Sequence, residues 1–116
     1  MAPMTEAETI FEHLKDGLGA FLLKIQTVRV LDEAAFERID ADARRLAQEL
    51  KNQALVPKAM LNEIRTATKM LQAEAPYMRA EQSMMLDMAS KLEMTFDLIL
   101  LGEDHNDRIP GVPRII

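Results

Sequence analysis

Apolar residues recur at three- and four-residue spacing along most of this chain, which is the pattern of amphipathic α-helices. The first such stretch begins at Thr5, where Thr5 and Glu8 have the spacing of a capping box, and it continues to Val28. Its apolar stripe consists of Ala7, Ile10, Phe11, Leu14, Leu18, Phe21, Leu22, Ile25 and Val28. We therefore predict a first helix over residues 5–28.

Three further helices follow from the same pattern. Asp32 is a favourable N-cap for the second, whose stripe is Ala35, Phe36, Ile39, Ala43, Leu46, Ala47, Leu50 and Ala54. Pro57 suits the first turn of the third, whose stripe is Met60, Leu61, Ile64, Ala67, Thr68 and Leu71. Because Pro76 interrupts the pattern, we predict that a fourth helix restarts near it and runs to Leu101, with one bent helix as the alternative.

Short connections between four amphipathic helices favour antiparallel neighbours. The fold prediction is therefore all-α: an up-down four-helix bundle domain over residues 1–102, followed by an irregular, proline-containing C-terminal tail over residues 103–116.

The tail is apolar although it cannot be helical. Gly102 is a natural helix stop, and Pro110 and Pro113 exclude a regular helix beyond it. Four aliphatic side chains nevertheless follow, namely Ile109, Val112, Ile115 and Ile116. Such residues favour burial, so we expect the tail to lie on its own bundle, on a second chain or on a partner.

The fourth helix carries two apolar stripes. The expected core stripe is Met78, Met85, Met88, Ala89, Leu92, Phe96 and Ile99. On roughly the opposite side lies a second stripe, made of Leu86, Met94, Leu98 and Leu101. A monomeric bundle does not need this second stripe, so we expect it to be covered by the tail, a second copy of the chain or another partner, unless its members are scattered surface residues.

Charge is unevenly distributed. Residues 1–43 sum to −5, residues 44–79 to +4 and residues 80–116 to −4, which gives the net −5 of the chain. The simplest interpretation is that a basic middle hairpin pairs with acidic flanking helices. The alternative is a patch for an acidic ligand or nucleic acid, formed by Arg44, Arg45, Lys51, Lys58, Arg65 and Lys69. The net negative charge and the lack of interleaved aromatic residues make nucleic-acid binding the less favoured interpretation.

Little in the sequence suggests catalysis, a cofactor or a metal. Cysteine is absent, and neither His13 nor His105 has the glutamate three residues earlier that a bundle di-iron site requires. The glycines do not form a phosphate-binding loop. The start of the chain resembles no secretory signal, and no stretch is apolar enough to span a membrane, so we expect a cytoplasmic protein.

His13 supports one alternative function. An exposed helical histidine with Lys15 nearby resembles the histidine phosphotransfer domains, which are four-helix bundles of about this size. That resemblance implies phosphoryl transfer through His13. In those domains the lysine lies one turn after the histidine, whereas Lys15 follows His13 by only two residues. An ordinary surface histidine is the simpler interpretation.

The hypothesis that the sequence favours is a small interaction or regulatory protein. We expect a homodimer or a complex with a protein partner, with the fourth helix and the tail as its binding surface.

Overall fold

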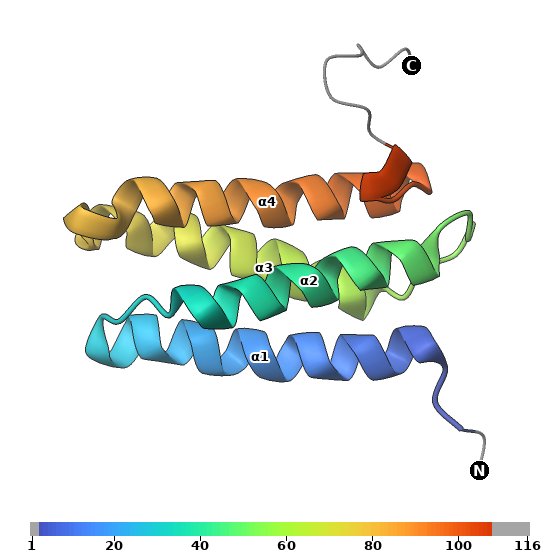
Figure 1. Ribbon diagram of the computed structural model, residues 1–116, viewed down its shortest axis with the longest axis horizontal. Helices are drawn as coiled ribbons and strands as arrows, with labels where there is room; N and C mark the ends of the chain where they lie inside the picture. Colours follow the sequence, from blue (N-terminus) through green and yellow to red (C-terminus); the bar gives the residue numbers. More distant parts are fainter. Residues whose placement is uncertain (1–2, 108–116) are drawn as a thin grey trace.

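The computed structural model describes residues 3–107 and confirms the all-α four-helix bundle. The four helices are α1 (Glu6–Val28), α2 (Glu33–Leu50), α3 (Lys58–Glu74) and α4 (Gln82–Leu101). Figure 1 shows that the chain reverses direction at each connection, so that successive helices alternate in direction.

The local signals at the helix ends act as predicted. Thr5 and Glu8 form a complete capping box at the start of α1, and the Asp32 side chain accepts the Ala35 N–H at the start of α2. Gly102 ends α4 in the left-handed conformation, with a φ of 72°. The sequence therefore encodes three of the boundaries through identifiable side-chain or backbone chemistry.

Two predicted boundaries were wrong. The second helix ends at Leu50, so Ala54 lies in the connection and not in an apolar stripe. The fourth helix does not restart at Pro76, because two short 3₁₀ turns, Ala75–Tyr77 and Arg79–Glu81, separate α3 from α4. Pro76 lies within the first of these turns, where the missing N–H of proline costs little.

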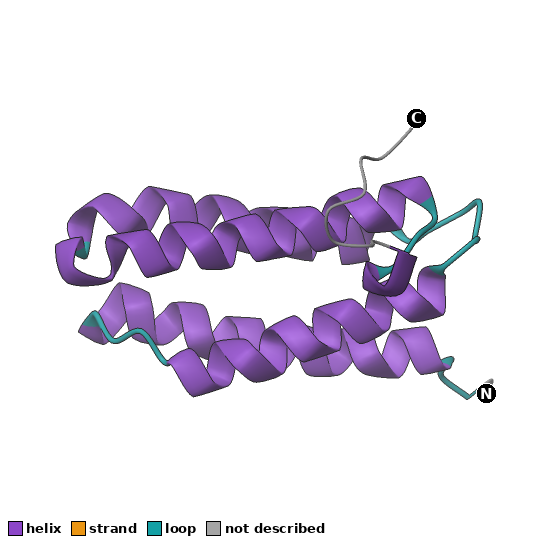
Figure 2. Ribbon diagram, turned by 45° about the horizontal axis from the view of Figure 1, so that its top comes forward, coloured by secondary structure: helices purple, strands orange, loops and turns teal. Residues whose placement is uncertain are grey.

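The helices form two hairpins, α1 with α2 and α3 with α4, which pack against each other (Figure 2). Between the hairpins, α2 packs on α4 and α1 packs on α3. Within residues 3–107, α2 and α3 are thus diagonal to each other, although they are consecutive in sequence. The short connection between them, residues 51–57, crosses one end of the bundle, and we call it the crossover segment.

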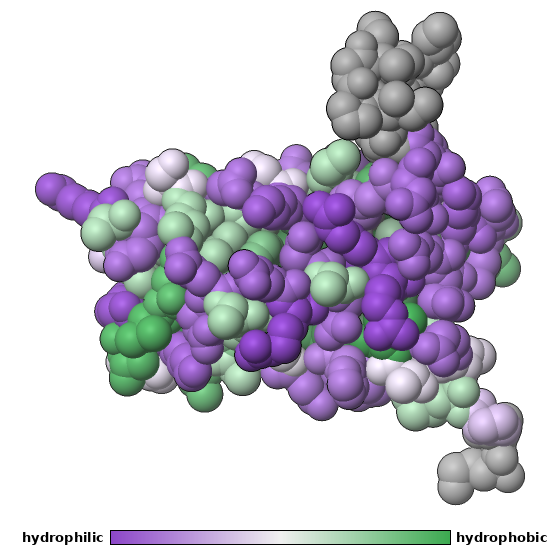
Figure 3. All heavy atoms as spheres, viewed as in Figure 1, coloured by the Kyte–Doolittle hydropathy of each residue, from purple (hydrophilic) through white to green (hydrophobic). Residues whose placement is uncertain are grey.

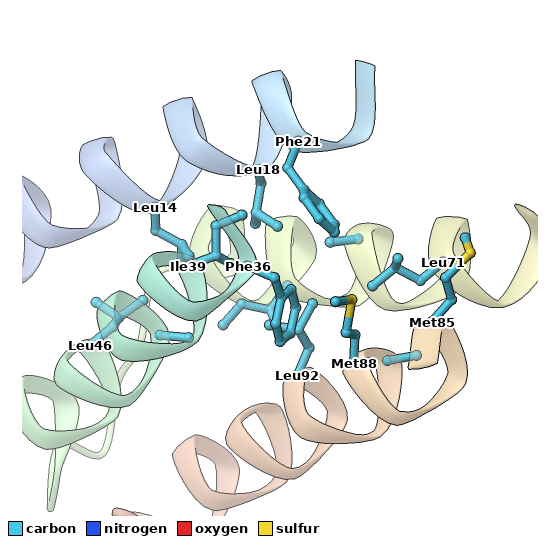
Figure 4. Packing of buried hydrophobic residues seen from close by; sticks show 14 of the residues in the cluster. Leu14, Leu18, Phe21, Phe36, Ile39, Leu46, Leu71, Met85, Met88 and Leu92 are labelled. Carbon is cyan, nitrogen blue, oxygen red and sulfur yellow. The ribbon is translucent and has the colours of Figure 1, made fainter. Parts of the chain in front are cut away.

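The core is built from the inward stripes of all four helices (Figure 4). The rings of Phe21 on α1 and Phe36 on α2 lie with their centroids 5.7 Å apart at an angle of 47°. On the α3–α4 side, Leu71, Met85 and Leu92 are fully buried. The helices α1 and α2 approach each other closely at Gly17, since a Cβ added there would lie 3.3 Å from Ile39 Cγ1.

Candidate interaction surfaces

The outer face of α4 retains most of the predicted second apolar stripe. Leu86, Met94 and Leu101 are 41 %, 38 % and 48 % exposed, respectively. Leu100, which the sequence interpretation omitted, is 60 % exposed. We refer to Leu86, Met94, Leu100 and Leu101 as the outer face. The outer face is not continuously apolar, because the exposed residues Ser90, Glu93 and Asp97 lie between its members.

Leu98 does not belong to this face. The predicted stripe included it, but its side chain is fully buried. Leu98 follows the buried Thr95 by three residues and therefore lies on the same side of the helix, at the border of the core. Helical spacing alone placed it within the second stripe, because spacing cannot show how far around α4 the rest of the bundle extends.

The tail residues that were expected to complete the binding surface, Ile109, Val112, Ile115 and Ile116, lie outside the described residues.

A compact turn follows α4, and we call residues 102–107 the C-terminal turn. Although this turn is acidic, Asp104 is only 5 % exposed. The Asp104 side chain accepts the Asn106 N–H at 2.8 Å, and the Asp107 side chain accepts the Asp104 N–H at 2.9 Å. These local bonds satisfy the carboxylates that the low exposure would otherwise leave unsolvated.

The C-terminal turn is bound to the crossover segment. Lys51 Nζ lies 2.8 Å from Asp107 Oδ1 and 3.8 Å from Asp104 Oδ2, and the Asn52 N–H donates to the Gly102 carbonyl at 3.3 Å. The hydrogen bond to Asp107 raises the pKa of Lys51. The same hydrogen bond, followed by the one from the Asp104 N–H, lowers the pKa of Asp107. Both charged forms are therefore favoured in the folded protein.

His105 also belongs to this turn. Its Nε2 lies 2.8 Å from the hydroxyl of Thr95, which is fully buried within α4. The sequence interpretation did not identify this contact. A threonine within the apolar helix, ten residues before a histidine that follows the helix, was the only available signal. The contact joins the C-terminal turn to the core.

His13 lies beside a cavity of about 330 Å³ between α1 and α2. The nearby Lys24 pairs with Asp32 at 3.1 Å. Lys15 is directed elsewhere, because its amine lies 3.3 Å from Glu12 and 5.7 Å from the centre of the Phe11 ring. Within residues 3–107, no hydrogen bond or ion pair joins His13 to Lys15.

The predicted basic patch is divided among different partners. Arg44 pairs with Asp40 at 3.0 Å, and Arg45 pairs with Glu6 of α1 at 3.4 Å. Lys51 binds the C-terminal turn, as described above. Two further members, Arg65 and Lys69, line a small cavity beside Phe96, and the Arg65 guanidinium lies 5.5 Å from the centre of the Phe96 ring. Lys58 is exposed in the first turn of α3. Ion pairs with both acidic flanks agree with the simplest interpretation of the charge pattern, but the expected basic middle hairpin was wrong, because α2 and α3 are diagonal to each other.

A larger cavity was not predicted. It is an open groove of about 590 Å³ between the start of α1, the end of α2 and the crossover segment, and we call it the N-terminal groove. Its apolar lining includes Met4, Phe11, Leu50, Leu55 and Met60. Four of its lining residues are glutamates, namely Glu6, Glu8, Glu12 and Glu49, and none is basic.

Other exposed apolar side chains gather at the opposite end of the bundle. Val28 and Val30 flank the end of α1, where Figure 3 shows an apolar patch. Tyr77 is 75 % exposed nearby, and the Arg29 guanidinium lies 6.0 Å from the centre of its ring. Arg29 also pairs with Glu74, so an ion pair between the two hairpins lies beside these apolar side chains.

Comparison with known proteins identifies no relative: no family model matches the chain, and neither the curated proteins nor the solved structures contain a significant match. Within the described part of the chain, no helix combines the length and apolarity needed to cross a membrane. The same residues include no cluster of three or more acidic, histidine or cysteine side chains that is suitable for a metal ion.

Proposed function

We propose that this protein is a helical protein-interaction module that self-associates through the outer face of α4. The observation that carries the proposal is the exposure of Leu86, Met94, Leu100 and Leu101 on one side of a helix whose other side is core. Of the four helices, α4 has the least one-sided distribution of apolar residues. Such a helix is typical of an element that is packed on both sides.

A second copy of the chain suits this face because its residues are self-complementary. An interface with two-fold symmetry pairs a surface with itself. If two α4 helices pack antiparallel around an axis close to Met94, Leu86 of one copy lies opposite Leu101 of the other. The same register places Ser90 opposite Asp97. Asp97 would then face a hydroxyl group and not another carboxylate, whereas the Glu93 side chains of the two copies would lie close to the axis, which agrees with weak association.

The size of the face suggests a weak dimer. The face runs from Leu86 to Leu101, a distance of about 22 Å along the helix axis at 1.5 Å per residue. A single helix face of this length buries less than the roughly 800 Å² per partner of a stable interface. We therefore expect association that depends on protein concentration.

Sedimentation equilibrium over a wide concentration range tests the proposal. The wild-type mass should rise from that of a monomer towards that of a dimer. The double substitution Met94→Asp/Leu101→Asp should keep the protein monomeric at every concentration while leaving its helical circular dichroism unchanged. Leu23→Asp is the control, because Leu23 is also an exposed leucine but lies on α1, and this variant should dimerise as the wild type does. A wild-type protein that stays monomeric would overturn the proposal.

A further inference from the structure

The N-terminal groove is independent of the outer face of α4, and its chemistry is distinctive. Leu50 and Met60 form a buried floor, and exposed Met4 and Leu55 form its sides. Two of the four glutamates that line the groove already have basic partners, since Glu6 pairs with Arg45 and Glu12 with Lys15.

The other two glutamates that line the groove, Glu8 and Glu49, have no basic partner in the described part of the chain, and only Glu8 accepts a hydrogen bond there. Glu8 accepts the Thr5 N–H as part of the capping box. The exposed carboxylate of Glu49, by contrast, has no hydrogen-bond or ion-pair partner among residues 3–107. An occupant of the groove should therefore combine aliphatic side chains with positive charge.

The chain contains a segment of this chemistry. Residues 108–116 read Arg-Ile-Pro-Gly-Val-Pro-Arg-Ile-Ile, with two arginines, four branched aliphatic residues and no acidic residue. Pro110 and Pro113 exclude a regular helix, so the segment suits a groove that accepts an extended chain.

The described part of the chain also ends at a residue that is bound to the end of α2, and the end of α2 lines the groove. Asp107, the last described residue, is held 2.8 Å from Lys51 Nζ. Lys51 directly follows Leu50 and comes two residues before Gln53, and both of these residues line the groove. Nine extended residues can reach about 30 Å at roughly 3.3 Å per residue. The attachment point and the reach therefore both permit binding within one chain.

We propose that residues 108–116 of the chain bind its own N-terminal groove, with their aliphatic side chains on the apolar floor and an arginine beside Glu49. The C-terminal turn is the anchor for this arrangement, because its bonds to Lys51 and Asn52 fix the point at which the segment starts. The segment then acts as an internal ligand that occupies the groove and excludes external basic, apolar peptides from it.

Paramagnetic relaxation tests this proposal in the full chain. Because the protein has no cysteine, Val112→Cys accepts a single nitroxide label, and the methionine methyl groups are the reporters. We expect strong broadening at Met4 and Met60, which line the groove, and none at Met78, which lies at the far end of the bundle. Broadening at Met94 without Met4 and Met60 would place the segment on α4 and overturn the proposal, as would the absence of broadening at any of these methionines.

Charge reversal provides the specificity test. Glu49→Lys should reduce the broadening at Met4 and Met60 at least several-fold, and combining it with Arg108→Glu/Arg114→Glu should restore the broadening. Glu37→Lys is the matched control, since Glu37 is also an exposed glutamate on α2 but lies outside the groove, and it should have no effect. Equal effects of Glu49→Lys and Glu37→Lys would contradict a specific contact.

A mixing experiment distinguishes binding within one chain from exchange between chains. Spin-labelled chains without isotope are mixed with isotope-labelled chains that carry no spin label. Binding within one chain predicts no broadening at Met4 and Met60 of the isotope-labelled chains. Broadening there would show that the segment binds a second copy, which would overturn the proposed arrangement.

Discussion

Lys51 Nζ lies 2.8 Å from Asp107 Oδ1, and this ion pair joins the end of α2 to the turn that follows α4. The two residues are 56 positions apart in sequence. Through this contact, the short segment that crosses the bundle and the end of the last helix hold each other in place. It is also where the basic middle of the chain meets its acidic C-terminal part.

The Lys51–Asp107 pair predicts a specific pH dependence of stability. Folding lowers the pKa of Asp107 below its ordinary 3.8, so its contribution is present above that value and is lost as pH falls through the folded pKa. Asp107→Asn should therefore lower the free energy of unfolding at neutral pH and make no difference in strong acid. Urea unfolding at several pH values measures this. Asp16→Asn, which removes an exposed acid on α1, is the control for the loss of one negative charge.

The Lys51–Asp107 pair also predicts that its contribution to stability is lost at high pH. Folding raises the pKa of Lys51 above its ordinary 10.5, so its contribution is present below that value and is lost as pH rises through the folded pKa. Lys51→Met should therefore destabilise the protein at neutral pH but have little effect in strong base. A Lys51→Met variant with the same unfolding curve as the wild type at neutral pH would show that the pair does not stabilise the turn.

Leu98 and Leu101 should respond differently to truncation. Leu98 is fully buried, so Leu98→Ala should cost about 2–5 kcal/mol of stability through lost burial and the cavity left behind. Leu101 is 48 % exposed, and Leu101→Ala should cost less than about 1 kcal/mol in the monomer. Urea unfolding at low protein concentration measures both. Equal losses would contradict the different positions of these residues on α4.

Gly17 and Gly19 form a second matched pair. An added Cβ at Gly19 meets nothing within 4 Å, so Gly19→Ala should stabilise the protein by about 0.5–1 kcal/mol because alanine favours the helix. Gly17→Ala should gain less, since the new Cβ lies 3.3 Å from Ile39 Cγ1. Leucine should separate the two positions more strongly, destabilising at position 17 and not at position 19. Thermal unfolding of the four variants provides the comparison.

The contact between Thr95 and His105 should be measurable as a coupling energy. Thr95→Val keeps the side-chain shape but removes the hydroxyl that lies 2.8 Å from His105 Nε2, and we expect a loss of about 1 kcal/mol. A double-mutant cycle with His105→Ala isolates the pair, and a coupling of about 0.5 kcal/mol or more is expected. Additive effects of the two substitutions would show that the hydrogen bond does not hold the turn to α4.

The sequence predicted the elements of the fold well because their signals are local. Helical spacing identified most of the buried stripe of every helix, and the Thr5, Asp32 and Gly102 signals each act within a few residues. The prediction that Leu86, Met94 and Leu101 lie on a side of α4 away from its core stripe followed from the same periodicity.

What the sequence could not supply depends on contacts between distant segments. The diagonal placement of α2 and α3 arises because α2 packs on α4, which no short-range pattern encodes. The burial of Leu98, the low exposure of Asp104 and the N-terminal groove follow from how the ends of the helices meet. The sequence could identify the charged and apolar groups, but it could not pair Lys51 with Asp107.

The most direct test of the central claim is an isotope-filtered nuclear Overhauser experiment on a mixture of two differently labelled samples of the chain. Pairing of α4 around Met94 predicts interchain contacts between the methyl groups of Leu86 and Leu101, and between the Met94 methyls of the two copies. Interchain contacts confined to Val28 and Val30 at the other end of the bundle, or none at concentrations where the mass is that of a dimer, would contradict self-association through the outer face of α4.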